Sequence, residues 1–418
     1  MTKGRFIILI GTICIIIGIG VYYFYQKNNP TPNSTIQKII DFSIFDTKKT
    51  STDQNNPSNE NSNPSDKPNQ RQQTSKLQQV SYKPIAGYGV FSKNIDRLVF
   101  DEKTNKNKTV TDPMPVVRYV DQETGIIYEQ DDKNTELRIS NTTIPNTYEA
   151  LFSSDMNHII YRFLDSDNQT IETYIGTLIN NTANTPKDLN GYFINQNIKN
   201  ISLSPDGLSY NFLKPKQVGV DVVSNNFTNP KEKVLFSSPL AEWLIDSGTN
   251  YINLTTKPSG LVKGFSYNID LKSGFYTKTV SGLGLTQTSS PDGLYNIYST
   301  IENKVPKIYI IYNKQNITND IGLKTFSEKC VYTKDAYYCA VPNNIYAGTY
   351  PDDWYQGTVS FNDDLWYIDL TNKKLTYIGS LNYLDQSIDA TDLKLSSDNN
   401  SLYFIDKKTS ILWKYILK

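Results

Sequence analysis

The chain has 418 residues, with 42 Lys and Arg against 42 Asp and Glu, so its formal net charge is zero. A nucleic-acid-binding protein needs a positively charged surface, and the balanced charge argues against that class. One His and three Cys are too few for the usual zinc, haem or iron–sulfur site, so we expect no metal and no cofactor. The 30 Tyr and 17 Phe favour strands.

Residues 6–25 predict a single transmembrane helix. The run from Phe6 to Phe24 contains 19 residues and no charge. At about 1.5 Å per residue it spans about 28 Å, close to the thickness of the hydrocarbon core of a bilayer. No small-residue cleavage site follows this run, which favours an uncleaved anchor over a signal peptide that is removed.

The charges beside this run predict the orientation of the anchor in the cell membrane. Lys3 and Arg5 precede the apolar run, and only Lys27 follows it closely. Positive residues favour the cytoplasmic side, so residues 1–5 form a short cytoplasmic end in this interpretation. The remainder of the chain would then lie outside the cytoplasm, and the lipid bilayer is the first predicted partner.

Residues 26–78 predict a flexible linker rich in Asn, Ser, Pro and Gln. Between Thr50 and Lys76 there is no aliphatic, aromatic or sulfur-containing side chain. Such a segment cannot bury enough apolar surface to offset the entropy of ordering it. A flexible linker of this length reaches about 40 Å on average, far enough to lift a domain from the membrane.

A repeated turn predicts the fold of residues 79–418. Ser204-Pro-Asp-Gly207 and Ser290-Pro-Asp-Gly293 each precede a strand rich in aromatic residues. Pro fixes φ, Asp binds nearby backbone amides and Gly accepts positive φ, which suits a tight hairpin. Weaker copies begin at residues 92, 153, 245, 333 and 396, at intervals of 41 to 63 residues along the series. The shorter intervals match a four-stranded propeller blade of about 40–50 residues.

We therefore predict an all-β fold, a seven-bladed β-propeller, with the weaker copies leaving six or eight blades as alternatives. The last blade ends after the strand at Ile411–Ile416, which leaves its fourth strand missing at the C-terminus. Leu77–Pro84 lies just before the first inner strand and is free to supply it. This pairing would close the ring and remove an open sheet edge.

The two Ser-Pro-Asp-Gly turns, each followed by a strand and a Tyr-x-Asp type strand, resemble the repeats of TolB-like and WD40-like propellers. The resemblance covers roughly residues 80–418, and the other turns have lost the Pro or the Gly. TolB-like propellers mostly act as protein-binding platforms in the cell envelope, and others are appended to peptidases. The resemblance implies a propeller that binds a partner, since no second domain follows residue 418.

The segment from Cys330 to Cys339 predicts a hairpin closed by a disulfide. It is symmetric about a Lys-Asp turn, so pairing Tyr332 with Tyr337 places the two cysteines opposite each other. Opposed residues at a non-hydrogen-bonded position lie close enough for a disulfide. The predicted oxidising location permits the bond, and the alternative is a pair of free buried cysteines.

An insertion from Pro342 to Asp364 separates the second and third strands of the sixth blade. Long loops in compact repeats are usually functional or disordered, and aromatic content argues against disorder. Aromatic rings beside carboxylates suit a protein, a cationic peptide or a sugar. The candidate ligand-binding residues are Tyr346, Tyr350, Asp352, Asp353, Trp354, Tyr355, Asp363 and Asp364. The alternative is a loop that folds over its own blade and buries its aromatic rings. We also expect the loop at residues 103–108 to share a face with this insertion.

The sequence predicts no catalytic residue. His158 is the only histidine, and no G-x-S-x-G motif accompanies it, so a structural role is favoured. Carboxylates at the mouth of the propeller pore could still act on a glycan as in glycosidases, although spacing does not locate such a pair. We therefore expect a binding scaffold for an envelope protein, a peptide or a polysaccharide, with a glycan hydrolase or lyase as the alternative. A sensor is disfavoured because residues 1–5 are too short to signal independently.

Overall fold

A computed structural model describes residues 46–48, 76–101, 105–179, 186–384 and 386–418. Within these residues, no helix has the length and apolar character needed to cross a membrane. The predicted anchor at residues 6–25 lies outside the described residues, as does nearly all of the predicted linker at residues 26–78.

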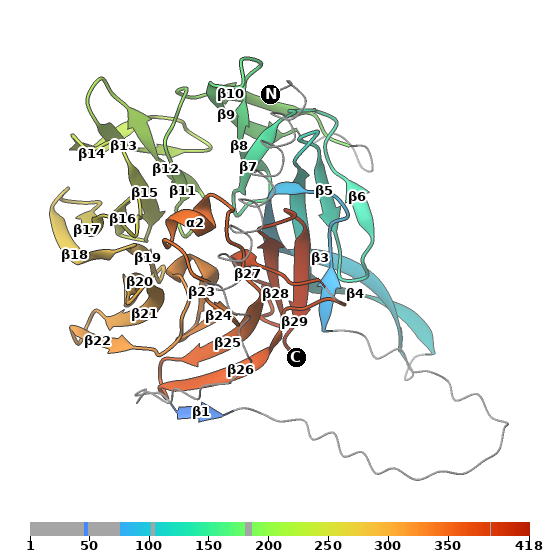
Figure 1. Cartoon of the computed structure of the whole chain (residues 1–418). Helices are drawn as coiled ribbons and strands as arrows, with labels where there is room; N and C mark the ends of the chain where they lie inside the picture. Colours follow the sequence, from blue (N-terminus) through green and yellow to red (C-terminus); the bar gives the residue numbers. More distant parts are fainter. Residues whose placement is uncertain (1–45, 49–75, 102–104, 180–185, 385) are drawn as a thin grey trace, which may run out of the picture. The chain divides into compact units, whose positions relative to one another are not determined.

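Seven β-sheets form the blades of a propeller, and in blades 1 to 6 the strands follow in sequence order from the centre outward (Figure 1). Blade 1 contains β3 (Ile85–Asp101), β4 (Lys106–Asp121), β5 (Ile127–Gln130) and β6 (Glu136–Arg138). Blade 2 contains β7 (Thr147–Phe152), β8 (His158–Leu164), β9 (Ile171–Leu178) and β10 (Leu189–Phe193). Blade 3 contains β11 (Ile201–Leu203), β12 (Ser209–Pro215), β13 (Val220–Asn226) and β14 (Lys233–Ser238).

The next three blades repeat this arrangement. Blade 4 contains β15 (Trp243–Ser247), β16 (Tyr251–Thr256), β17 (Lys263–Asp270) and β18 (Tyr276–Leu283). Blade 5 contains β19 (Thr286–Ser289), β20 (Tyr295–Glu302), β21 (Val305–Tyr312) and β22 (Ile317–Asp320). Blade 6 contains β23 (Cys330–Thr333), β24 (Ala336–Pro342), β25 (Asp363–Asp369) and β26 (Lys374–Ser380). A short strand, β1 (Asp46–Lys48), pairs in parallel with β26.

Blade 7 is assembled from both ends of the propeller. Its strands are β27 (Ala390–Leu395), β28 (Ser401–Asp406), β29 (Leu412–Ile416) and β2 (Leu77–Gln79). β2 pairs antiparallel with β29, with Leu77 opposite Tyr415. This arrangement confirms the predicted closure of the ring and the count of seven blades.

Hydrophobic clusters between neighbouring blades hold the propeller together. In β8, Ile159 packs in a cluster with blade 1, whereas Ile160 packs in a cluster with blade 3. Both residues are fully buried, because consecutive side chains of a strand point to opposite faces and both faces of this sheet are covered. β8 therefore contains a continuous apolar run at Ile159–Tyr161.

The Ser-Pro-Asp-Gly turns adopt the predicted chemistry. Ser209 donates its backbone N–H to Ser204 Oγ at 3.1 Å, and Leu208 donates its N–H to Asp206 Oδ1 at 2.9 Å. Gly207 has a φ of 65° and Gly293 a φ of 69°, in the left-handed region that glycine favours. Each turn therefore links the first and second strands of its blade, as expected.

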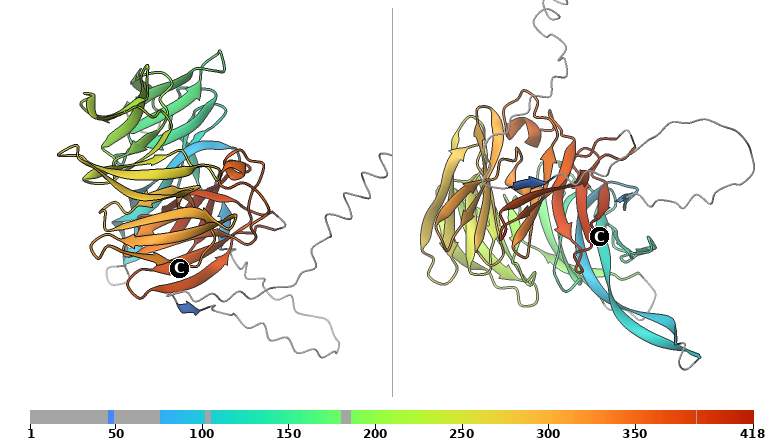
Figure 2. Two further views of the ribbon diagram at one scale, coloured as in Figure 1. Left: turned by 60° about the vertical axis from the view of Figure 1, so that its left-hand side comes forward. Right: turned by 90° about the horizontal axis from the view of Figure 1, so that it is seen from below.

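The predicted turn at Ser92 is wrong. β3 and β4 pair from Ile85 opposite Asp121 to Asp101 opposite Lys106, with one register shift between Ile85 and Gly87 and none beyond Ser92. The segment that follows Ser92 contains neither Gly nor Pro, so no residue there forces the chain to reverse. The result is a long hairpin, which we call the arm, and Figure 2 (right) shows it in cyan extending beyond the blades.

The arm and the insertion lie on opposite faces of the propeller. Because strands alternate in direction, the turns between first and second strands share one face, which we call the turn face. Connections between second and third strands share the other face with the connections between blades. The insertion joins β24 to β25, whereas residues 102–105 join β3 to β4. The expectation that residues 103–108 share a face with the insertion is therefore wrong.

Candidate functional site: the central cavity and the insertion

A cavity of about 870 Å³ lies where the first strands of the blades converge. Its wall includes the segment Tyr88–Ser92 of β3, Ile245 and Asp246 of β15, and Thr288 of β19. Exposed residues of the turn face also line it: Ser154, Pro205 and Ser397. The cavity therefore reaches the surface on the turn face, where the arm begins at Ser92.

Two of the carboxylates in the cavity wall are neutralised by cations. Glu149 forms an ion pair with Arg162. Asp392 accepts from Lys394 Nζ at 2.9 Å, and the same ammonium lies 4.2 Å from the centroid of the Tyr88 ring. These pairs leave little net charge on their side of the cavity.

The other two acids in the wall, Asp246 and Glu328, have no Lys or Arg within ion-pair distance among the described residues. Burial raises the pKa of Asp246 to about 6, although Ser289 donates its backbone N–H to Oδ2 at 2.9 Å. Burial also raises the pKa of Glu328 to about 7. Desolvation penalises the charged form of a carboxyl group, so both acids hold a proton at a higher pH than usual. Groups of this kind in a cavity are candidates for function.

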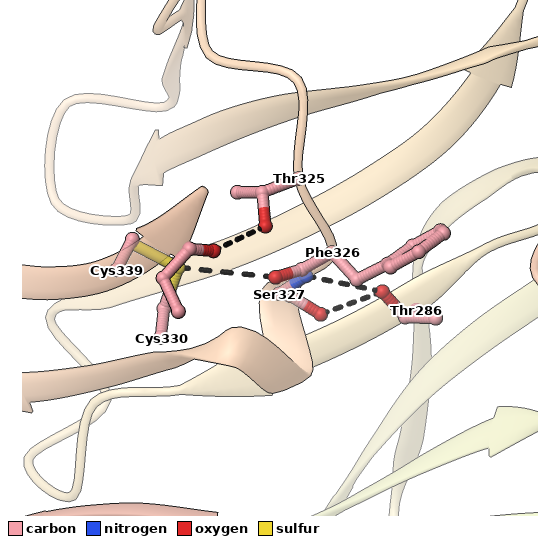
Figure 3. Close-up of a disulfide and its surroundings, with 7 residues drawn as sticks. Thr286, Thr325, Phe326, Ser327, Cys330 and Cys339 are labelled. Carbon is pink, nitrogen blue, oxygen red and sulfur yellow. Dashed lines mark hydrogen bonds between the residues drawn. A yellow bond between two sulfur atoms is a disulfide. The ribbon is translucent and has the colours of Figure 1, made fainter. Parts of the chain in front are cut away.

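A short 3-10 helix, η1 (Ser327–Lys329), positions Glu328 in the wall. Thr286 of β19 accepts from the backbone N–H of Ser327 at 3.3 Å, and the two hydroxyl groups lie 2.8 Å apart (Figure 3). The Cys330–Cys339 disulfide follows directly, with the two cysteines paired opposite each other in β23 and β24. The predicted register and the predicted disulfide are thus both confirmed. The bonds to Thr286 hold the backbone before Glu328, and the disulfide holds it after.

The insertion folds over blade 6, reaches blades 4 and 7 through Gly260 and Asp389, and buries most of its rings. It contains a short helix, α2 (Asp352–Tyr355). Tyr350 is 1% exposed, and Trp354 and Phe361 are each 2% exposed. Trp354 stacks on Phe326 with a centroid distance of 5.0 Å. The rings of Trp354 and Tyr350 are therefore not at the surface, because they form a small core with Phe326 and Phe361, as the alternative of a folded loop predicted.

The remaining candidate residues of the insertion do not form one binding surface. Asp352 accepts from the backbone N–H of Gly260 in blade 4 at 2.7 Å, and Asp353 accepts from the N–H of Thr349 at 2.7 Å. Asp363 is fully buried, and Asp364 is half-buried at the start of β25. Tyr346 is 58% exposed. Tyr355 turns inward, and its hydroxyl group donates to Glu328 Oε1 at 2.7 Å.

Sequence reasoning missed Asp246, Glu328, Lys329 and Asp389. Lys329 is fully buried, with Nζ 2.8 Å from Asp363 Oδ2 and 2.5 Å from Asp389 Oδ1. Glu328 and Lys329 are neighbours in the chain, but no spacing joins them to Asp246 or Asp389, since the three positions belong to blades 6, 4 and 7. The signal that they share is indirect: each lies at or next to the first strand of a blade.

His158 has a structural environment in the turn of blade 2. Its Nδ1 lies 2.7 Å from Asp155 Oδ2, and its ring stacks on Phe227 at a centroid distance of 5.3 Å. Among the described residues, no group of three or more His, Cys, Asp or Glu side chains is arranged to hold a metal ion.

No protein-family model and no curated protein sequence matches the chain. Among solved structures, it is similar to an oligogalacturonate lyase from Vibrio parahaemolyticus, with 10% identity and a TM-score of 0.46 over 80% of this chain and 99% of that chain. It is similar to TolB from Acinetobacter baumannii, with 11% identity and a TM-score of 0.39 over 79% of each chain. It is also similar to the β-propeller domain of the Trilobed protease from Pyrococcus furiosus, with 13% identity and a TM-score of 0.47 over 78% of this chain and 95% of that chain. These similarities concern the propeller fold alone and carry no argument about function.

Proposed function

We propose that this protein is a binding scaffold of the cell envelope whose propeller takes a polar ligand into its central cavity from the turn face. The observation that carries the proposal is the cavity of about 870 Å³, with Asp246 and Glu328 in its wall and no cation paired to either among the described residues. A cavity of this size suits a peptide end or a short glycan. A cationic group on the ligand would supply the positive charge that these acids lack, and a hydroxyl-rich group would donate further hydrogen bonds to them.

The location in this proposal follows from the sequence. Residues 6–25 anchor the chain in the cell membrane, residues 1–5 remain cytoplasmic, and the propeller lies outside the cytoplasm. The Cys330–Cys339 disulfide supports this location, because such bonds persist in oxidising compartments. Two experiments on intact cells test the proposed topology. The first is digestion with an external protease, and the second is labelling with a membrane-impermeant thiol reagent before and after the disulfide is reduced.

Calorimetric titration of the purified full-length protein tests the ligand class. The probes are short peptides with Lys or Arg at one end and neutral oligosaccharides of the cell wall. We expect binding that weakens at least about tenfold in Asp246→Asn and Glu328→Gln, since each removes a charge-assisted hydrogen bond of about 1.5–3 kcal/mol. Glu242→Gln is the matched control, because Glu242 is an exposed acid paired with Lys199 and Lys257 on the outer surface. Equal affinity in all three variants would remove the cavity from the proposal.

A second candidate function is hydrolysis or elimination on a glycan. The observation that favours it is the position of two carboxyl groups in the cavity wall. Burial raises the pKa of Glu328 to about 7 and that of Asp246 to about 6, values suited to proton transfer near neutral pH. Release of new reducing ends or unsaturated products from oligosaccharides, abolished in Glu328→Gln, would support it. Binding of an oligosaccharide without any product would favour the scaffold.

A further inference from the structure

Three ionisable side chains meet in the interior of blade 6 at its junction with blade 7. Lys329 ends η1, Asp363 begins β25, and Asp389 immediately precedes β27. All three side chains are 0% exposed. Lys329 Nζ lies 2.8 Å from Asp363 Oδ2 and 2.5 Å from Asp389 Oδ1. An amine and a carboxyl group are thus held in contact within the folded chain, with a second carboxyl group touching the same amine.

Two aromatic rings lie close to the amine of this cluster. Lys329 Nζ lies 5.3 Å from the centroid of the Trp354 ring and 5.5 Å from that of Phe361. Both rings are buried, so they shield the cluster from solvent. Burial of an ammonium group and a carboxylate is costly, and it favours any reaction that converts both to neutral groups.

The two carboxyl groups have different environments. Asp389 Oδ2 accepts from Trp354 Nε1 at 2.9 Å and from the N–H of Phe361 at 3.0 Å, so both of its oxygens are hydrogen-bonded. Asp363 Oδ2 accepts from Lys329 and from the N–H of Ala390 at 2.7 Å, whereas its Oδ1 is buried without a partner among the described residues. Burial raises the pKa of Asp363 to about 6. Asp363, with one buried oxygen free of hydrogen bonds, is therefore suited to react as the carboxylic acid, and Asp389, held on both oxygens, is suited to exchange protons with Lys329.

We propose that Lys329 and Asp363 are joined by an intramolecular isopeptide bond, which forms in the folded chain with Asp389 as the proton relay. The neighbouring carboxylates hold the pKa of Lys329 above its usual value, so its ammonium must first give a proton to Asp389. The neutral amine then attacks Cγ of Asp363. Asp389 passes its proton to the hydroxyl group that leaves from Asp363, and the second proton lost by the nitrogen returns to Asp389.

This condensation is balanced without an oxidant or a co-reactant. One ammonium, one carboxylic acid and one carboxylate become one amide, one water and one carboxylic acid. The C–N bond forms, the C–O bond to the leaving hydroxyl group breaks, and the total charge remains zero. The product contains no buried charge, which is the physical driving force.

The bond would enclose the insertion between two fixed points of blade 6. It ties η1 to the first residue of β25, and the Cys330–Cys339 disulfide lies within the same closed segment. Covalent closure of a segment restricts the unfolded chain and so stabilises the fold. Glu328 is the neighbour of Lys329, so the same bond would hold the wall of the cavity in place.

Peptide mass spectrometry of the full-length protein tests the proposal directly. The folded protein is purified, its disulfide is reduced, and it is digested with pepsin. We expect one cross-linked species that joins the peptide containing Lys329 to the peptide containing Asp363, with a mass lower by one water than the sum of the two. Unmodified peptides at Lys329 and Asp363 as the main products would overturn the proposal, as would a link from Lys329 to Asp389.

Variants distinguish the relay from simple packing. Lys329→Arg keeps the positive charge, and we expect only linear peptides from it. Asp389→Asn keeps the size of the side chain but removes the proton acceptor, so we expect the bond to form about 100-fold more slowly or not at all. Lys394→Arg is the matched control, since Lys394 also pairs with an Asp but is partly exposed, and we expect full cross-linking. Full cross-linking in Asp389→Asn would overturn the role of Asp389 as the relay. The digest of the wild-type protein shows whether the bond is present, even if a variant fails to fold.

Discussion

The hydroxyl group of Tyr355 donates a hydrogen bond of 2.7 Å to Glu328 Oε1. Tyr355 belongs to the insertion, and Glu328 lines the central cavity. The insertion is therefore connected to the cavity from the face opposite its opening, even though the rings of Trp354 and Tyr350 are buried.

We expect Glu328→Gln to stabilise the protein increasingly as the pH rises above the ordinary pKa of a Glu side chain, 4.5. The pKa of Glu328 in the folded chain is about 7, above its ordinary value of 4.5. The folded state thus binds this proton more tightly than the unfolded state. The stabilising contribution is complete below about pH 4.5 and is lost as the pH rises through 7. Gln stays neutral and still accepts from Tyr355, so the variant should gain on the order of 1–3 kcal/mol relative to wild type between pH 5 and pH 8.

Urea unfolding at a series of pH values measures this difference. Glu242→Gln is the control, because nearby Lys199 and Lys257 lower the pKa of Glu242 and its surface ion pairs contribute at most about 1 kcal/mol. Parallel pH profiles for wild type and Glu328→Gln would show that Glu328 titrates normally.

We expect Trp354→Ala to lower the free energy of unfolding by about 3–5 kcal/mol, the range for truncating a buried aromatic side chain. The ring is 2% exposed, stacks on Phe326 and donates from Nε1 to Asp389 at 2.9 Å. Tyr346→Ala is the control within the same insertion, because Tyr346 is 58% exposed and should change stability by less than about 0.5 kcal/mol. Thermal and urea unfolding measure both, and similar costs for the two variants would mean that the insertion does not fold over its blade.

We expect removal of the disulfide to cost about 2–3 kcal/mol, since the closed loop is short. Cys330 and Cys339 are separated by 9 positions and are both buried, so a double replacement by Ala avoids new polar groups. Urea midpoints with and without reductant provide the measurement. Reductant should lower the midpoint of the wild type toward that of the double variant and leave the variant unchanged. A wild-type midpoint that does not respond to reductant would argue that the thiols are free.

We expect Leu77→Ala to cost about 2–5 kcal/mol, because a buried Leu is truncated. Leu77 is 4% exposed, and its strand closes the ring through the pairing with Tyr415. Tyr82→Ala, at an 83% exposed position beyond the strand, is the control. Limited proteolysis should cleave the Leu77→Ala variant between blades 7 and 1 before other sites. Equal resistance in both variants would mean that the ring does not depend on this strand.

Local signals in the sequence determined much of the fold. The Ser-Pro-Asp-Gly turns at Ser204 and Ser290 located two hairpins, because turn geometry depends on residues that are adjacent in the chain. The symmetry about Lys334-Asp335 predicted the Cys330–Cys339 pair, because a tight turn sets the register of its two strands. The unpaired final strand predicted the closure by Leu77.

Only the tertiary structure decided which side chains surround the cavity and which are buried. Asp246 and Glu328 are far apart in sequence and share a wall because blades converge around an axis. The apolar pattern of the insertion was equally consistent with an exposed binding loop and with a small core, and the contact of Trp354 with Phe326 selected the core. The polar segment after Ser92 continued as a strand because the partner strand β4 was available along its whole length. Burial and long-range pairing depend on how distant segments pack, and short-range turn chemistry does not contain that information.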